Sequence, residues 1–326
     1  MRRRELLALI GGAITVRPPA VRAQQKTVPV IGFLSSASAE GFASILPPFR
    51  DGLNQEGFTE GGTVAIEYAW AAGNYDKLPG LAADLVGRKV AVIVAAGDAV
   101  AALAAKEATS TVPIVLSIGD DPLKLGLVDN LGRPGGNITG VTVFMGELAF
   151  KRMELLAELV PAAKLTLLCN PHNPNAEGEA EGAQAAAIRS GRDLQIIKAG
   201  NDSEIESAIA GIARQPGTAM MVGTDPYFFS RQVKITALAA RHAIPTIYFH
   251  RGFAVAGGLI SYGATITAEN RVAGIYAGRI LKGERPGELP FQQPSKIELV
   301  INLKTASSLG LTIPPAILAR ADEVIE

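Results

Sequence analysis

Short apolar runs rich in Val and Ile alternate along this chain with Ala- and Leu-rich segments of helical length. In the first half, four runs are interpreted as strands: residues 28–34, 63–71, 90–97 and 112–119. Three intervening segments are expected to be helices: residues 41–56, 77–89 and 99–109. Nearly continuous apolar strands are typical of a sheet covered on both faces. Their alternation with helices predicts parallel strands, that is, a doubly wound α/β fold.

The segment RPGGNITGVTVF, residues 133–144, interrupts this order with a strong turn signal, and the alternation then starts again. Residues 92–120 and 220–252 share one plan, strand, turn with aspartate, helix and strand, in which Asp98 corresponds to Asp225. The second half is expected to hold helices at 146–161, 175–191, 202–215, 228–242 and 269–283. A chain of 326 residues is long enough for two such halves.

The first 23 residues have the pattern of a signal peptide. A basic start precedes a short apolar run, Leu6–Val16, and the small residues Val21 and Ala23 precede a polar stretch. The run is too short to span a bilayer. Arg3 and Arg4 resemble a twin-arginine signal, although Arg2 stands where Ser or Thr is usual. We expect cleavage after Ala23 and export to the periplasm, by either the twin-arginine or the general route.

Charge and cysteine content exclude several classes of protein. The formal net charge is zero, and removal of five arginines and Glu5 with the leader leaves 26 basic and 30 acidic residues, a charge of −4. No basic excess is present to neutralise phosphates, so we expect no nucleic-acid partner. Cys169 is the single cysteine and lies far from the leader. It is interpreted as a buried thiol at a strand end, and neither an internal disulfide nor a lipid anchor is expected.

Motifs for metal binding and catalysis are missing from the sequence. His172, His242 and His250 lie far apart, and no HExxH, CxxC, GxSxG, Walker or GxGxxG pattern occurs. Asp120 and Asp121 are adjacent, so on an extended strand end they point apart and would not share a proton. We therefore expect no metal, no cofactor and no enzymatic activity. Catalysis with Asp98 or Asp121 as a base is the weakest of three alternatives.

Small polar residues at the ends of predicted strands are the candidate binding site, because open α/β sheets bind ligands at the carboxyl ends of their strands. The candidates are Ser35, Ser36, Ser38, Gly97, Asp98, Ser117, Asp121, Asn170, Asn173, Thr224 and Asp225. A helix start beside Ser35–Ser38 could receive a ligand carboxylate. Asp98, Asp121 or Asp225 could pair with an ammonium group.

Aromatic side chains could enclose an apolar part of the ligand. The candidates are Trp70, Phe144, Tyr248 and Tyr262, with Phe33 and Tyr227 as further possibilities. A place in the core is the alternative for each of them. Between the two adjacent acids, we expect Asp121 to face the cleft, because Pro122 restricts the turn that follows it.

Several long stretches closely resemble one known family. They are residues 108–142 (ATSTVPIVLSIGDDPLKLGLVDNLGRPGGNITGVT), 257–264 (GGLISYGA), 277–315 (AGRILKGERPGELPFQQPSKIELVINLKTASSLGLTIPP) and 317–326 (ILARADEVIE). Together with the leader they are similar to the tryptophan/tyrosine-type substrate-binding proteins of ABC transporters. The resemblance implies a type I periplasmic-binding-protein fold, with two Rossmann-like lobes joined by a three-segment hinge.

The resemblance also implies how the chain is divided and what it does. Residues 28–143 with 263–288 would form the first lobe and residues 144–262 with 289–326 the second, with hinges near 142–144, 261–264 and 289–292. A small ligand would be held between the lobes and delivered by a monomer to an ABC permease of the inner membrane. Characterised relatives bind aromatic amino acids. A periplasmic sensor for a membrane kinase or chemoreceptor is the alternative that the sequence leaves open.

One departure from the family concerns the ligand. Relatives often carry a longer run of small residues before Asp-Pro, whereas this chain has Ile118-Gly119-Asp120. The additional acid favours a ligand with an extra hydrogen-bond donor or a positive charge.

Overall fold

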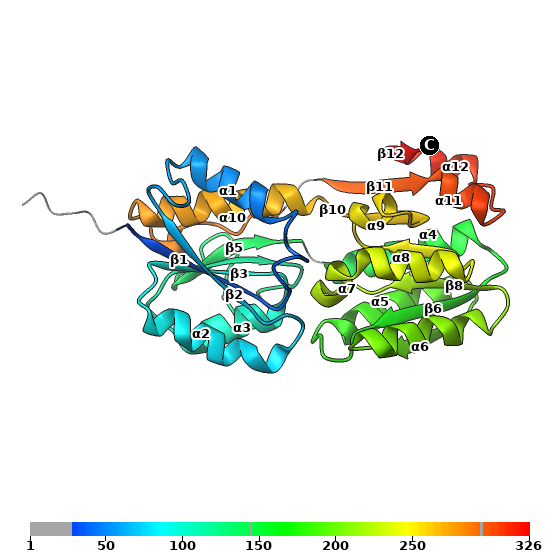
Figure 1. Ribbon diagram of the computed structural model, residues 1–326, viewed down its shortest axis with the longest axis horizontal. Helices are drawn as coiled ribbons and strands as arrows, with labels where there is room; N and C mark the ends of the chain where they lie inside the picture. The colour runs from blue at the N-terminus through cyan, green and yellow to red at the C-terminus, as the bar shows by residue number, and fades with distance from the viewer. Residues whose placement is uncertain (1–27, 144, 294–295) are drawn as a thin grey trace, which may run out of the picture.

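The computed structural model describes residues 28–143, 145–293 and 296–326, and these form two lobes side by side (Figure 1). The predicted leader and Phe144 lie outside the described residues. Each lobe is built on one sheet, with strand order β2-β1-β3-β4-β5 in the first and β12-β11-β10-β9-β8-β6-β7 in the second. Neighbouring strands pair in parallel, except that β10 and β11 are antiparallel. The predicted α/β fold with two parallel-sheet lobes is confirmed.

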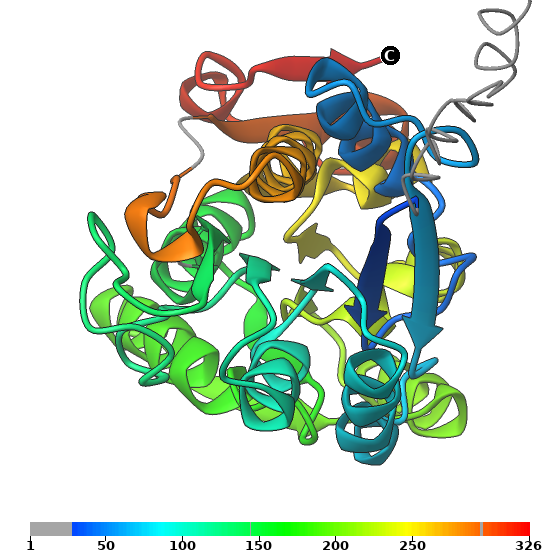
Figure 2. The same cartoon turned by 90° about the vertical axis from the view of Figure 1, so that its left-hand side faces the viewer.

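The first lobe encloses its sheet between two pairs of helices. Its strands are β1 (Val30–Ser35), β2 (Ala65–Trp70), β3 (Val92–Ala96), β4 (Ile114–Ile118) and β5 (Ile138–Thr142). One face carries α1 (Leu46–Gln55) and α10 (Ile266–Leu281), and the other carries α2 (Leu78–Gly87) and α3 (Ala99–Ala108) (Figure 2). The short 3₁₀ turns η1 (Tyr75–Lys77) and η2 (Pro286–Glu288) lie at its edge. Strands β3 and β4 are fully buried, as the apolar runs predict.

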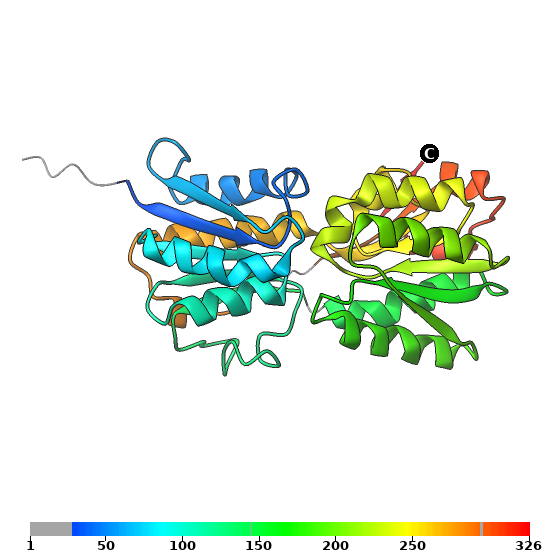
Figure 3. The same ribbon diagram turned by 60° about the horizontal axis from the view of Figure 1, so that its bottom comes forward.

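The second lobe repeats this plan with more elements (Figure 3). Its strands are β6 (Lys164–Cys169), β7 (Leu194–Lys198), β8 (Thr218–Val222), β9 (Thr246–Tyr248), β10 (Ile260–Ala264), β11 (Ile297–Asn302) and β12 (Glu323–Ile325). Its helices are α4 (Met145–Leu159), α5 (Ala176–Arg189), α6 (Asp202–Ala213), α7 (Pro226–Ser230), α8 (Gln232–Arg241), α9 (Arg251–Val255), α11 (Leu303–Ser308) and α12 (Pro315–Leu318). Cys169 is buried in β6, as expected. No helix in the described ranges is long and apolar enough to cross a membrane.

The chain passes between the lobes three times. The first passage follows Thr142, and the second joins Ala264 of β10 to α10. The third follows Gln292, whose N–H donates to the Gly140 carbonyl of the first lobe. Because Ala264 still pairs with Ile297 of β11, the second and third passages lie a few residues later than the sequence suggests.

Helix α10 belongs to the first lobe although the strands on either side of it, β10 and β11, belong to the second. Its backbone lies directly against that of α1. A Cβ atom on Gly274 would lie 2.0 Å from the Phe49 carbonyl oxygen, and one on Gly52 would lie 2.0 Å from the Arg271 carbonyl oxygen. Both positions therefore require glycine for the two helices to approach this closely.

Two predicted helices differ from the structure. The segment 41–56 becomes helical only at Leu46, because Pro47 and Pro48 occupy the first turn, where the missing N–H groups cost nothing. The segment 228–242 is two helices, α7 and α8, separated at Arg231.

Candidate ligand-binding site between the lobes

The loops that follow the strands of both sheets meet at the boundary between the lobes and enclose two adjoining cavities. The larger, here the polar cavity, has a volume of about 400 Å³. The smaller, the apolar cavity, has a volume of about 70 Å³. Both are lined by Gly97, Gly119, Thr224 and Pro226, so they are contiguous. The position of both cavities and the size of the polar one are typical of a small-molecule site.

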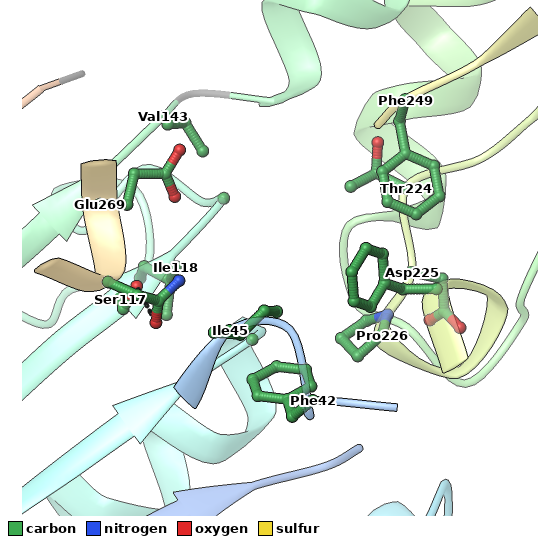
Figure 4. A pocket seen from close by; sticks show the side chains of 14 residues that line it. Phe42, Ile45, Ser117, Ile118, Val143, Thr224, Asp225, Pro226, Phe249 and Glu269 are labelled. Carbon is green, nitrogen blue, oxygen red and sulfur yellow. Dashed lines mark hydrogen bonds between the residues drawn. The ribbon is translucent and has the colours of Figure 1, made fainter. Parts of the chain in front are cut away.

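Aromatic and aliphatic side chains from both lobes form the apolar cavity (Figure 4). The first lobe contributes Phe42, Ile45, Ile118 and Val143, and the second contributes Pro226, Phe229 and Phe249. This wall suits a flat apolar group. Sequence reasoning did not single out Phe42, Phe229 or Phe249.

Asp98 is buried at the start of α3, where it acts as the N-cap. Its Oδ1 accepts the Ala101 N–H at 2.9 Å, and its Oδ2 accepts the Ser36 hydroxyl. Burial raises the pKa of Asp98 to about 6, against the lowering effect of these hydrogen bonds. Asp98 lines the polar cavity. The buried Ser36 does not line it, but its hydroxyl fixes the position of the Asp98 carboxylate.

Asp225 has the corresponding position at the start of α7 and connects the two lobes. Its carboxylate accepts hydrogen bonds from the Phe228 N–H and from the amides of Asn170 and Asn173. The Tyr75 hydroxyl, from the first lobe, donates to its Oδ2 at 2.9 Å. Burial raises the pKa of Asp225, although these donors favour its charged form. Asn170, Asn173 and Asp225, all predicted from the sequence, therefore form one hydrogen-bonded group.

Two glycines of the first lobe, Gly41 and Gly73, allow the lobes to approach closely. A Cβ atom on Gly41 would lie 2.4 Å from the Ser230 Cβ of the second lobe. One on Gly73, where φ is +84°, would lie 2.4 Å from the Tyr227 ring. The structure is thus a closed arrangement of the two lobes.

The two adjacent acids both line the polar cavity but have different environments. Asp120 is only 4% exposed, while Asp121 is partly exposed. Asp121 Oδ1 accepts the Leu123 N–H at 2.9 Å, in the turn that Pro122 restricts. Among the described residues, neither carboxylate oxygen of Asp120 has a hydrogen-bond partner of good geometry. Asp120, which is not among the predicted site residues, is therefore the more deeply buried acid of the cleft.

The environment of Asp120 favours its neutral form. Burial is the main cause that raises its pKa to about 8, the charge of Asp98 adds to it, and the nearby Ala99 N–H opposes it. An uncompensated buried carboxylate takes up a proton rather than remain charged.

Glu269 is a site residue that sequence reasoning missed. It lies in the first turn of α10, lines the apolar cavity and is 5% exposed (Figure 4). Its Oε1 has no hydrogen-bond partner within the described part of the chain, and burial raises its pKa to about 8. The sequence feature that could have indicated Glu269 is its place in the first turn of a helix that directly follows a connection between the lobes.

A buried ion pair, also missed, supports the polar cavity. The Arg152 guanidinium donates to Glu179 Oε1, and both side chains are almost completely buried. Glu179 also accepts the Thr224 N–H at 2.7 Å and the Thr224 hydroxyl at 2.8 Å. Burial lowers the pKa of Arg152, and the charge of Glu179 counteracts this effect. The pair therefore fixes the position of Thr224, which lines both cavities.

The serines after β1 do not form the anion site that was predicted. Ser35 Oγ accepts the Ala37 N–H, and Ser38 Oγ accepts the Gly41 N–H. Neither lines a cavity, and α1 begins several residues further on, at Leu46. By contrast, Ser117 does line the apolar cavity and lies 3.4 Å from Asn270 Oδ1.

The predicted aromatic residues pack inside the lobes instead of lining the cavities. Trp70 is stacked on Tyr68 with 5.7 Å between ring centroids, and Tyr248 is stacked on Phe253 at 4.8 Å. Tyr262 is partly buried between the hydrophobic clusters, and Phe144 is outside the described residues. Successive side chains of a strand point to opposite faces. Tyr248 therefore faces the core, and the residue after it lines the apolar cavity.

Metal binding has no candidate within the part of the chain that the structure describes. No group of three or more His, Cys, Asp or Glu side chains there could hold a metal ion. Asp98, Asp120 and Glu179 line one cavity, but Glu179 is already paired with Arg152.

The raised pKa of Glu269 predicts a pH-dependent effect of replacing it by glutamine. Its pKa rises from an ordinary value near 4.5 to about 8 on folding, so its contribution to stability is lost as pH rises between these values. Each pH unit in this range lowers the free energy of unfolding of the natural protein by up to about 1.4 kcal/mol. Glutamine does not titrate, so the free energy of unfolding of Glu269→Gln, relative to that of the natural protein, should rise by about 2–4 kcal/mol from pH 5 to pH 8. Urea unfolding at both pH values measures this gain, and a difference independent of pH would contradict it.

Two parallel-sheet lobes with a cavity between the carboxyl ends of their strands define the two-lobed fold of type I periplasmic binding proteins. Residues 27–325 match the family described as ABC transporter substrate binding protein. The chain belongs to this family, and its class of function is the binding of small ligands.

Three relatives illustrate the range of similarity. The "Tyrosine-binding protein" of Clostridioides difficile is 25% identical over 264 residues, which are 81% of this chain and 75% of that protein. The ABC domain from Streptococcus pneumonia in complex with L-Trp is 27% identical, with a TM-score of 0.79 over 90% of this chain and 100% of that one. An ABC transporter periplasmic solute binding protein of Actinobacillus succinogenes with bound D-allose shares the fold at 16% identity. Its TM-score is 0.57 over 86% of this chain and 99% of that one.

Proposed function

We propose that this protein is the extracytoplasmic receptor of an ABC importer and presents a small polar ligand to a permease of the inner membrane. The ligand is an amino acid or a related compound with an amino group and an apolar, in particular aromatic, body. The observation that carries the proposal is the pair of adjoining cavities enclosed by both lobes. One is walled by aromatic rings and the other by carboxylates. The relatives named for tyrosine and crystallised with L-Trp support the ligand class.

Delivery requires that the ligand can enter and leave. The three connections between the lobes provide a hinge, and the Tyr75–Asp225 hydrogen bond joins the two lobes in the closed arrangement. A ligand that contacts both lobes favours the closed form only by as much as it binds that form better. The chain in this role begins after its leader, at Gln24.

Native mass spectrometry of the protein purified from its own periplasm tests the proposal. We expect a co-purified small molecule, which, added back at 100 times its Kd, stabilises the protein by about 2.7 kcal/mol. Deletion of the gene should abolish uptake of the same compound. Normal uptake with loss of a signalling response would instead assign the protein to a membrane sensor.

A further inference from the structure

Each cavity contains one buried carboxyl group with an oxygen atom that has no hydrogen-bond partner of good geometry among the described residues. Asp120 in the polar cavity and Glu269 in the apolar cavity are 4% and 5% exposed. Both oxygens of Asp120 and Oε1 of Glu269 lack a hydrogen-bond partner among the described residues. Buried polar groups are almost always satisfied in folded proteins, so these atoms point to a ligand that supplies donors.

Two of the helix N-termini around the cavities are already capped by the protein's own acids. Asp98 accepts the Ala101 N–H at the start of α3, and Asp225 accepts the Phe228 N–H at the start of α7. A helix N-terminus is the usual backbone site for a ligand carboxylate, and at these two helices that site already holds a carboxylate.

Side-chain cations are scarce around the two cavities in the described part of the chain. Arg152 is fully buried against Glu179 and lines neither cavity, although its Nε and Nη1 atoms have no hydrogen-bond partner there. Among the described residues that line these two cavities, Lys124 is the single cation, and it is exposed. Acidic residues that line the cavities are Asp98, Asp120, Asp121, Glu179, Glu181, Asp225 and Glu269. Acids outnumber the single cation in this lining, so it favours a ligand cation over a ligand carboxylate.

We propose that the ligand is an arylalkylamine without a carboxylate, an inference that rests on the receptor function proposed above. Its ammonium group is received by Asp120 in the polar cavity. Its aromatic body lies among Phe42, Phe229 and Phe249, and a polar group at its far end bonds to Glu269. The shared wall between the cavities allows one molecule to occupy both.

Matched pairs of compounds isolate the effect of the carboxylate. The mature protein, unfolded and refolded to remove any bound molecule, is titrated calorimetrically with tyramine and L-tyrosine, and with tryptamine and L-tryptophan. We expect at least one amine to bind 10-fold or more tightly than its amino acid. Tighter binding of the amino acids would overturn this inference and leave the receptor function standing. If none of the four compounds binds, the ligand classes given in this inference and in the proposed function would both be wrong.

Substitution of Asp120 tests its role directly. Asp120→Asn should weaken binding of the tighter amine 10-fold or more, whereas Asp129→Asn, an exposed acid nine residues later, should change it less than threefold. Equal affinity of Asp120→Asn and the natural protein would overturn the assignment. Circular dichroism confirms that both variants are folded.

Proton release provides a second readout that a merely structural role would not give. The groups that face Asp120 are Asp98 from α3, Glu179 from α5, and Asp121 and Lys124 from its own loop. Because burial raises the pKa of Asp120 to about 8, it is mostly protonated at pH 7 and should lose its proton when an ammonium group binds. Titrations at pH 7 in buffers of different ionisation enthalpy should show release of about one proton. Asp120→Asn should abolish that release, and unchanged release in this variant would contradict the role of Asp120.

Discussion

Leucine in place of Gly41 is expected to abolish ligand binding while leaving the protein folded. A Cβ atom at this position would lie 2.4 Å from the Ser230 Cβ in the other lobe, closer than such atoms can approach. The remaining carbons of leucine make the overlap worse. Since the lobes are joined by a hinge, opening relieves the clash without disturbing either core. The variant would be held open.

Calorimetry with the identified ligand measures this effect. A protein held open loses the contacts of one lobe, and we expect Kd to rise at least 100-fold, or about 2.7 kcal/mol. Gly80→Leu is the matched control, because a Cβ atom there has nothing within 4 Å. Small-angle scattering should show that addition of ligand lowers the radius of gyration of the natural protein but not that of Gly41→Leu. Retention of affinity within threefold would show that Gly41 is not a closing contact.

Methionine in place of Arg152 is expected to destabilise the second lobe more than any exposed substitution. The change leaves the Glu179 carboxylate buried without its cation, and removal of one partner from a buried pair costs about 3–5 kcal/mol. Because Glu179 also holds the backbone and side chain of Thr224, ligand affinity should fall as well.

Urea unfolding measures the cost, with an exposed ion pair as the control. Arg279 pairs with Glu284 at 2.6 Å on the surface of the first lobe, and Arg279→Met should cost about 0–1 kcal/mol. A loss below 1 kcal/mol for Arg152→Met would mean that Glu179 becomes neutral or is hydrated in the variant, so the pair would not be structurally required.

Local patterns predicted most of the fold because strand and helix alternation is local. The predicted helix boundaries are wrong where one or two residues interrupt the local pattern. Pro47 and Pro48 are compatible with a first helical turn but not with the helix interior, so α1 starts late. Arg231 divides a segment that reads as one helix, and the three-residue strand β12 is too short to give a pattern.

The sequence predicted site residues at the ends of strands and in the loops that follow them. Asp98, Thr224 and Asp225 are examples, and each lines a cavity. Tyr75 and Glu269 were not predicted, because their position depends on how the lobes dock and on which lobe receives α10. For Asp120 and Asp121, the turn at Pro122 engages one carboxylate and leaves the other enclosed, which the sequence order alone does not reveal.

The path of the chain through α10 has a consequence for biosynthesis. The core of the N-terminal lobe includes α10, so it stays incomplete until the ribosome has passed Leu281, long after β1 to β5 have emerged. The glycine contacts between α1 and α10 then join segments more than 200 residues apart, and contacts of such long range form slowly. We therefore expect the first lobe of a nascent chain to complete its core only late in synthesis. A truncated product that ends before α10 is expected to be a substrate for proteases rather than an independent domain.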